Sequence, residues 1–232
     1  MATATKNGVA KNRIAELVDG KKSGVREVQI SPPNMQTAVI KIRGTTPYVQ
    51  SKFSEKAREE MKATQEAGSA GKKGKKRTPK DFKKCFEDAT YKSAKGEFGI
   101  PCGAFRAAMI SACRTVGFMM THAKVSGIHI EADCKDADPN DIGTELVKIT
   151  GKRCYFEAPV RNDNGKADIR ARPRWEAGWS ATLRIRFDAD MFSISDVTNL
   201  IARVGMQIGV GEGRPDSKKS CGMGWGLFEI VN

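Results

Sequence analysis

Alternating apolar and polar residues predict several β-strands along the chain. The clearest strand is Ala181–Asp188, in which every second residue is apolar and the others are polar or charged. In Thr37–Arg43, Val39 and the Ile40/Ile42 pair alternate with Lys41 and Arg43, so we expect one apolar and one basic face. Further strand candidates are Val125–Glu131, Leu146–Ile149, Arg153–Val160, the extended and basic Lys166–Trp175, and Trp225–Val231.

Three segments have the periodicity and start signals of helices. Ser54–Ala67 begins with Ser54 as N-cap, and Ser193–Ile208 begins with Ser193 or Ser195 before Asp196. In Gly103–Val116, apolar residues recur on one face at helical spacing: Phe105, Ala108, Met109, Ala112 and Cys113. The sequence Asn-Asp-Asn-Gly at 162–165 is a strong hairpin turn signal.

The order of these elements is βαββαβ once the insertions are left aside. It predicts an α+β fold of the ferredoxin-like or RRM-like type, a palm whose antiparallel sheet has two helices on one face. The open face is then expected to present four cations: Lys41, Arg43, Arg184 and Arg186. We expect residues 1–30 to form a flexible N-terminal arm and residues 31–232 a single domain. Its insertions are a basic, thumb-like loop after the first strand, at about 68–84, and a hairpin in the middle.

The chain is strongly basic, which narrows the classes of partner. Of its 232 residues, 40 are Lys or Arg and 27 are Asp or Glu, a net charge of +13. Residues 72–84 hold eight basic residues and one acid, +7 of that total. This excess favours a polyanion, but an anionic membrane surface, an acidic protein or simple solubility also fit it. No stretch approaches the roughly 18 apolar residues of a membrane span, and no signal core is present. The expected location is cytoplasmic, with no membrane partner.

The cysteines and acidic residues indicate neither a metal site nor a cofactor. The six cysteines stand far apart without a CxxC pair, which favours reduced, mostly buried thiols over a zinc site. The acids between 133 and 141 lack the spacing of a calcium loop, and a solvated loop is the favoured interpretation.

The most unusual segment is the glycine-rich run at 208–230, IGVGEGRPDSKKSCGMGWGLFEI. It follows a helix and opens a strand, so it does not fit a dinucleotide fingerprint, and it contains no GxxxxGK[ST] run. Glycine amides beside cations suit a phosphodiester backbone, although a plain connector to an edge strand fits the composition equally well. The candidate binding residues here are Gly209, Gly211, Gly213, Arg214, Lys218, Lys219, Gly222, Gly224 and Trp225.

A row of arginines is a second candidate site. Arg170, Arg172 and Arg174 share parity, so an extended strand directs all three to one side. Tyr48, Phe53, Trp175 and Trp179 are aromatic candidates for stacking on unpaired bases, but the favoured interpretation for a tryptophan is burial in the core.

These segments resemble the RAMP superfamily, the RRM-like proteins of CRISPR effector complexes. The resemblance lies in the glycine-rich run ending in G-x-G-x-G-x-F-E and a hydrophobic residue, in GIPCGAFRAAMISACR at 99–114, and in VIKIRGTTPYVQSKF at 39–53, which includes Lys52. It is strongest to the repeated backbone subunit that binds crRNA in Cascade-type complexes. It implies that Arg106 reaches the nucleic-acid backbone and that subunits form a filament along the strand. A stand-alone, phage-encoded relative is as consistent with these motifs as a CRISPR subunit.

Three functions follow as hypotheses. The leading one is sequence-independent binding of single-stranded nucleic acid, RNA favoured over DNA, through phosphate contacts by a homo-oligomer. The second is a metal-independent endoribonuclease, because RAMP processing enzymes use a histidine near the first helix; His122 is the weak catalytic candidate, and His129 lies in the next strand. The third is an anti-CRISPR mimic that contacts CRISPR effector subunits.

Overall fold

The computed structural model describes residues 31–68, 79–125, 127–134, 145–161, 167–217 and 222–231. The chain divides into a unit of residues 1–32 and a unit of residues 33–232, and the larger unit holds the sheets and helices described below. The expected flexible arm at 1–30 lies outside the described residues. So do most of the basic insertion, at 69–78, and the turn at 162–165.

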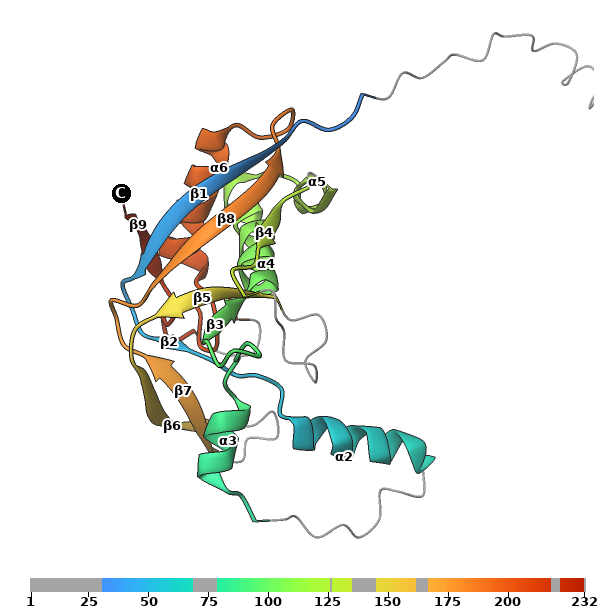
Figure 1. Ribbon diagram of the computed structural model, residues 1–232, viewed down its shortest axis with the longest axis vertical. Coiled ribbons are helices and arrows are strands. Elements are labelled where there is room, and N and C mark those ends of the chain that lie inside the picture. The colour runs from blue at the N-terminus through green and yellow to red at the C-terminus, as the bar shows by residue number, and fades with distance from the viewer. Residues whose placement is uncertain are drawn as a thin grey trace, which may run out of the picture. The chain divides into compact units, whose positions relative to one another are not determined.

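An antiparallel sheet is the centre of the larger unit (Figure 1). Its strands follow the order β3-β5-β8-β1-β9, and β4 also pairs with β8. The bounds are β1 Met35–Gly44, β3 Gly99–Pro101, β4 His129–Glu131, β5 Leu146–Thr150, β8 Ser180–Asp188 and β9 Phe228–Val231. The strand expected at 181–188 is confirmed, with its apolar residues buried.

The alternation in β1 differs from the expected pattern at one residue. Ala38, Ile40 and Ile42 are buried, whereas Val39 is 61% exposed and shares the outer face with Lys41 and Arg43. Successive side chains of a strand point to opposite faces, and Val39 lies between the inward-facing Ala38 and Ile40, so it faces outward.

Two helices cover the inner face of this sheet. α4, Cys102–Ala112, continues into a 3₁₀ turn at Cys113–Val116, and its expected apolar face is buried. α6, Ile194–Arg203, begins with a capping box between Ser193 and Asp196 and ends in a π-helical turn at Val204–Ile208.

The expected strand at Val125–Glu131 is wrong in its first half. Val125 ends a short helix, α5 (Met120–Val125), and β4 begins only at His129. Gly127, with a φ of 69°, lies between the two elements. A left-handed residue interrupts an extended strand, and glycine adopts it at low cost.

A second sheet and two helices complete the unit. β2 (Tyr48–Val49), β7 (Ala167–Trp175) and β6 (Arg153–Arg161) form an antiparallel sheet in the order β2-β7-β6. β6 and β7 pair from Arg153↔Trp175 to Arg161↔Ala167, which confirms a hairpin. α3 (Phe82–Asp88) lies against β7, and α2 (Glu55–Glu66), capped by Ser54 as expected, has no buried side chain among those described. The described residues thus form an α+β structure with a curled antiparallel sheet, and none of their helices is long and apolar enough to cross a membrane.

The corner between β1 and β2, residues 44–50, joins the two sheets to the glycine-rich run. Gly44 packs so closely on Trp179 that a Cβ there would lie 2.0 Å from its Nε1, which donates to Thr46 O at 2.9 Å. Gln50 is 1% exposed; its amide donates to Gly99 O at 2.7 Å, and its backbone N–H donates to Pro173 O at 3.1 Å. The corner therefore holds β3, β7 and β8 against one another.

Two glycines of the run offer a matched test of this close packing. Gly224 and Gly226 have φ values of 70° and 72°, so alanine carries the same left-handed strain of about 1–2 kcal/mol at either position. A Cβ at Gly226 would lie 1.8 Å from Val210 O, whereas one at Gly224 would meet nothing within 4 Å. We expect Gly226→Ala to lower the free energy of unfolding by about 1–3 kcal/mol more than Gly224→Ala. Equal effects in urea unfolding would contradict this packing.

The contact between α3 and β6 predicts a pH dependence of stability. The guanidinium of Arg153 lies over Phe86 and Phe98, 4.4 and 4.7 Å from the ring centroids, and donates to Glu87 at 2.7 and 3.1 Å. These hydrogen bonds, together with one from Lys92, lower the pKa of Glu87 from 4.5 to about 2. Since the folded pKa is depressed, the stabilisation is complete above pH 4.5 and is lost as the pH falls toward 2.

We therefore expect Glu87→Gln to lower the urea midpoint at pH 7, and the difference from wild type to shrink as the pH falls from 5 to 3. Glu66→Gln is the control, because among the described residues Glu66 pairs with Lys62 alone, at 4.0 Å on an exposed helix surface. A wild-type to Glu87→Gln difference that stays constant over this pH range would contradict the assignment.

Candidate nucleic-acid interface

The glycine-rich run folds into two limbs, and both are hydrogen-bonded to the corner of residues 44–50. Residues 209–217 form the first limb and residues 222–227 the second. Gly213 O accepts hydrogen bonds from the amides of Met223 and Trp225, at 2.8 and 3.3 Å, which ties the limbs together. Glu212 N donates to Val49 O at 2.9 Å and Gly226 N to Pro47 O at 2.7 Å, which ties both limbs to the corner.

Packing explains several of the glycines. A Cβ at Gly211 would lie 2.5 Å from Val49 O, and one at Gly213 would lie 2.4 Å from the ring of Trp225. Both residues also have positive φ, of 85° and 74°. The connector interpretation is therefore correct for these positions, whatever they bind.

The first limb forms the floor between two adjoining hollows, which together we call the loop groove. One, of about 640 Å³, lies between the run, the β6–β7 hairpin and the corner; its lining includes Val160, Arg170, Gly213, Met223 and Trp225. The other, of about 650 Å³, lies between the run and helices α4 and α5. Ala104, Gly211, Arg214 and Ser217 line both hollows, so the two hollows adjoin at the first limb.

Cations and unpaired amides occur along the loop groove. Arg170 lines the first hollow, Arg114 and Lys124 line the second, and Arg214 lines both. The backbone amides of Gly213 and Arg214 have no acceptor among the described residues. Consecutive amides beside a left-handed glycine form a concavity suited to an anion. Three segments predicted separately, the glycine-rich run, the arginine row and the start of α4, therefore meet in one groove.

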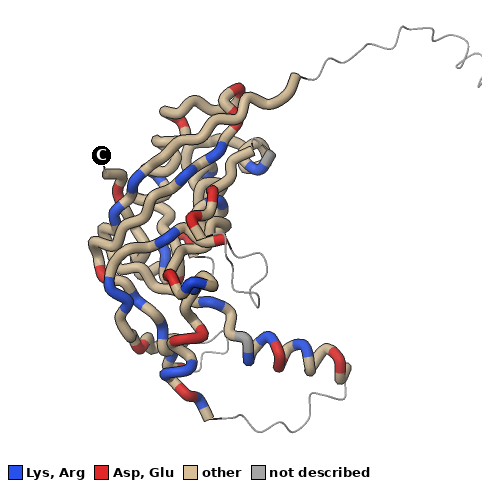
Figure 2. Tube along the Cα trace, in the orientation of Figure 1, with Lys and Arg blue, Asp and Glu red and all other residues tan. Residues whose placement is uncertain are grey.

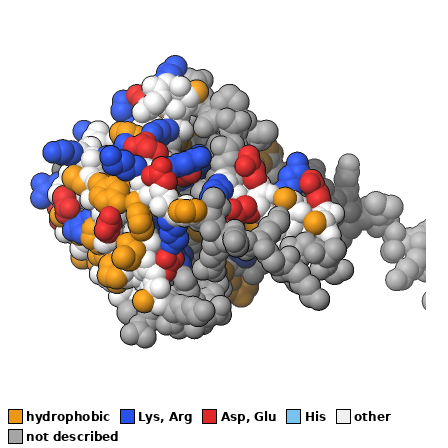
Figure 3. Space-filling view, turned by 90° about the horizontal axis from the view of Figure 1, so that it is seen from below, with side chains coloured by type: hydrophobic (Ala, Val, Ile, Leu, Met, Phe, Trp, Pro, Cys, Tyr) orange, Lys and Arg blue, Asp and Glu red, His pale blue; other side chains and the backbone are white. Residues whose placement is uncertain are grey.

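The arginine row lies on one face of β7, as its parity predicts, but carboxylates accompany it. Arg172 Nε donates to Glu212 Oε2 at 2.6 Å, and Arg170 Nη1 lies 3.8 Å from Glu212 Oε1. Arg174 pairs with Glu176 at 3.0 Å and lies over the ring of Phe156, 4.9 Å from its centroid. Figure 2 shows acidic residues among the basic ones along the chain, and the face in Figure 3 has both charges around an apolar patch.

A hydrogen-bonded cluster fixes the first limb of the run to α4. Asp216 accepts from Arg114 Nη2 at 2.6 Å and from the Ser111 hydroxyl, while Arg114 also donates to Ser111 Oγ at 2.7 Å. Burial raises the pKa of Asp216, but these hydrogen bonds and the charges of Arg114 and Arg214 outweigh it, so the pKa is below its usual range. The limb is thus attached to α4 by a charged contact as well as by its backbone.

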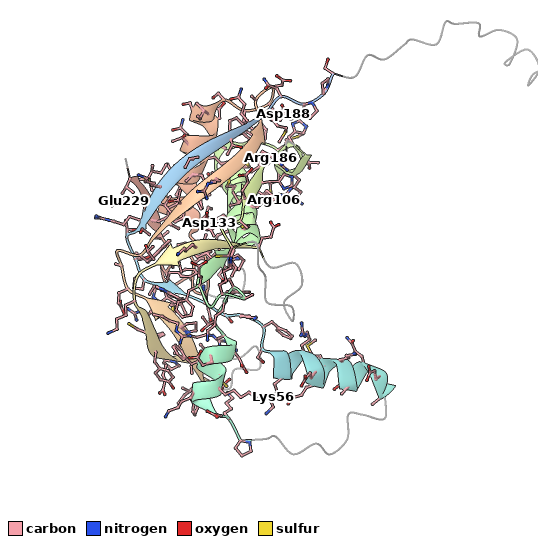
Figure 4. The ribbon with its side chains drawn as sticks, in the orientation of Figure 1. Lys56, Arg106, Asp133, Arg186, Asp188 and Glu229 are labelled. Atoms are coloured by element: carbon pink, nitrogen blue, oxygen red, sulfur yellow. The ribbon has the colours of Figure 1, made fainter. Side chains whose placement is uncertain are left out.

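The cations expected on the open sheet face form a separate set. All four are exposed, but Arg43 pairs with Glu229 at 3.4 Å and Arg184 pairs with Asp133. Lys41 and Arg186 have no acidic partner among the described residues. In Figure 4, Glu229 on β9 and Arg186 on β8 belong to this sheet, whereas Arg106 comes from α4. Charge is therefore balanced over much of this face.

Several single candidates are occupied within the fold. Arg106 donates to Ile128 O and Lys124 O, both at 2.9 Å, and so fastens the end of α5 instead of extending toward solvent. Tyr48, Trp175 and Trp179 are at most 1% exposed, so they do not offer a face to a base, and the core interpretation is correct for both tryptophans. Phe53 is 59% exposed.

The remaining candidates lie apart from the loop groove or outside the described residues. His122 is exposed on α5 with its ring centroid 6.0 Å from that of Phe118, and it lines neither hollow. His129 faces Arg186 across the β4–β8 pairing. Among the described residues, no group of His, Cys, Asp or Glu could hold a metal ion.

The other predicted binding residues are distributed around the corner and the run. Lys52 lies just after the corner, Gly209 ends the π-helical turn, and Gly222 and Gly224 belong to the second limb. Lys218 and Lys219 fall outside the described residues.

Four residues that line the loop groove were not among the predicted binding residues: two acids that pair with arginines, and two further cations. Glu212, Asp216, Arg114 and Lys124 all line the loop groove. The one available signal is Glu212, a lone acid between two glycines in a basic run. The others become visible only when α4 and the run are placed side by side.

Comparison with known proteins identifies no family for this chain. No protein-family model matches it, and no curated protein does. Among solved structures, it is similar to a chain in the cryo-EM structure of the type III-B Cmr-beta bound to cognate target RNA, with a TM-score of 0.42 and 10% identity. The match covers 98% of this chain and 66% of that one, so this chain spans about two thirds of its length.

The tryptophans allow a direct check of the loop groove's exposure. Trp175 and Trp179 are 0% and 1% exposed, whereas Trp225 is partly exposed and lines the groove. We expect acrylamide to quench one of three emitting fractions, and Trp225→Phe to remove that fraction. A quenchable fraction that survives in Trp225→Phe would contradict the placement of the tryptophans.

Proposed function

We propose that this chain binds the phosphate backbone of single-stranded nucleic acid along the loop groove, independently of sequence. RNA is the favoured ligand over DNA. The observation that carries the proposal is the meeting of the glycine-rich run, the arginine strand and α4 at one groove. Cations line both of its hollows, and its floor holds the backbone amides of Gly213 and Arg214, which have no acceptor in the part of the chain that the structure describes. Arginine and backbone amides are the usual donors to phosphate, and they do not distinguish bases.

The apolar lining of the loop groove supports a single strand as the ligand. Met223 is 56% exposed and lies with Trp225, Pro159 and Val160 in the hollow beside the hairpin. Unpaired bases bury apolar surface and stack on aromatic rings, whereas the bases of a duplex are already stacked. A groove with cations on one part and apolar side chains on another fits both halves of a nucleotide.

The strand order supports the RRM-like part of the proposal. With β1, β4, β8 and β9 taken as the four palm strands, their order in the sheet is β9-β1-β8-β4, and α4 and α6 follow the first and third of them. That is the arrangement expected of a βαββαβ palm. A RAMP-like backbone subunit that assembles along a strand is the corresponding biological proposal.

Anisotropy titrations of labelled 30-mers of uridine and of thymidine, with a duplex of equal length, test the function. We expect submillimolar binding of the single strands that weakens steeply with salt. Arg170→Gln with Arg214→Gln should weaken it at least roughly tenfold and reduce the salt slope by about 1.4, which is 0.7 for each lost single-strand phosphate contact.

Lys41→Gln with Arg186→Gln is the matched control, because it removes the same charge from the open sheet face. We expect this pair to change the dissociation constant less than threefold. A loss in the control as large as that in the groove variant would place the strand on the sheet face. No salt-dependent binding by the wild-type protein would reject the function.

A further inference from the structure

Glu212, one of the two carboxylates that line the loop groove, contacts two arginines of β7. Glu212 bridges Arg172, at 2.6 Å, and Arg170, at 3.8 Å. The Glu212 side chain is 23% exposed and that of Arg172 only 15%, so the closer ion pair is largely withdrawn from water. A phosphate that approaches Arg172 from the groove meets this carboxylate first.

The main chain at Glu212 is held in place, whereas its side chain is free to change rotamer. Its amide is anchored to Val49 O at 2.9 Å, and the glycines on both sides have left-handed φ values of 85° and 74°. No side chain of residue 211 or 213 restricts the carboxylate. A change of side-chain rotamer can therefore move the carboxylate away from the arginines while the loop keeps its hydrogen bond to the corner.

We propose that Glu212 is an internal substitute for phosphate, which occupies the Arg170–Arg172 pair in the free protein and is displaced by the phosphodiester backbone. This rests on the proposed function and adds a residue that sets its affinity. In the free protein, the carboxylate keeps two arginines oriented and partly desolvated. On binding, the exchange of one anion for another costs the protein an ion pair, so affinity is held below the level that the arginines alone would give.

The opposite role of Glu212 makes a different prediction. If it only positions the arginines for phosphate, its removal lets Arg170 and Arg172 reorient and weakens binding. Gln separates the two roles, because its side-chain oxygen can still accept the hydrogen bond from Arg172 Nε but carries no charge. Glu176→Gln is the matched control: it makes the same change of charge beside Arg174 of the same strand, and Glu176 does not line the groove.

The experiment measures the dissociation constants of the wild-type protein, Glu212→Gln and Glu176→Gln for the labelled uridine 30-mer at one fixed salt concentration. We expect Glu212→Gln to bind about three- to tenfold more tightly than Glu176→Gln. In the Arg170→Gln, Arg172→Gln background the advantage of Glu212→Gln should disappear, because no cations remain to be released. Thermal unfolding of each variant confirms that the compared proteins are folded. Glu212→Ser, which removes the carboxylate without leaving an amide in its place, should also bind more tightly than Glu176→Gln.

The outcomes separate the inference from the function beneath it. Wild-type binding, with Glu212→Gln equal to or weaker than Glu176→Gln, would overturn the displacement role and leave the function in place. A gain that persists without the two arginines would also overturn it. Absence of binding in the wild-type protein and in all variants would reject both.

Discussion

The corner of residues 44–50 is the constraint on which the rest of the structure depends. A Cβ has no room at Gly44, which lies against the ring of Trp179, or at Gly211, which lies against Val49 O. The same few residues bond to both limbs of the glycine-rich run, to β3 and to β7, and Trp179 of the β7–β8 connection is buried against them. Packing and neutral hydrogen bonds therefore fix the walls of the loop groove, and the ion pair between Arg114 and Asp216 adds a charged attachment of the first limb to α4.

Ion pairing changes the meaning of the chain's basic charge. A row such as Arg170, Arg172 and Arg174 represents three positive charges in the sequence, but Glu212 and Glu176 neutralise much of that charge locally. Arg43 and Arg184 on the open face are paired in the same way. Positions along the loop groove differ from those on the face because apolar side chains accompany the cations there, as do backbone amides that have no acceptor among the residues described. Local chemistry, more than net charge, distinguishes a binding site from a solvated surface.

The elements that local signals specify were predictable from the sequence, and those that depend on distant partners were not. The alternation in β8, the apolar face of α4 and the Ser193 cap are all encoded within a few residues, and all are present. α3 was missed because Lys83 and Lys84 resemble a basic loop, and its stabilising contact is Arg153, 66 residues beyond Glu87. Likewise, Arg172 and Glu212 are 40 residues apart, so only the fold brings them together. The prediction that the three arginines share one face of the strand was correct. The contact of Glu212 with two of them was not predictable, because the only hint in the sequence is its place between two glycines.

The central claim is that a single strand lies in the loop groove and not on the open face of the sheet. Photo-crosslinking of a uridine 30-mer that contains 4-thiouridine, followed by mass spectrometry of the attached peptides, tests it most directly. We expect crosslinks in the second limb of the run, at Met223 and Trp225, and in the β6–β7 hairpin near Val160. Crosslinks confined to β1 and β8 around Val39 would contradict it.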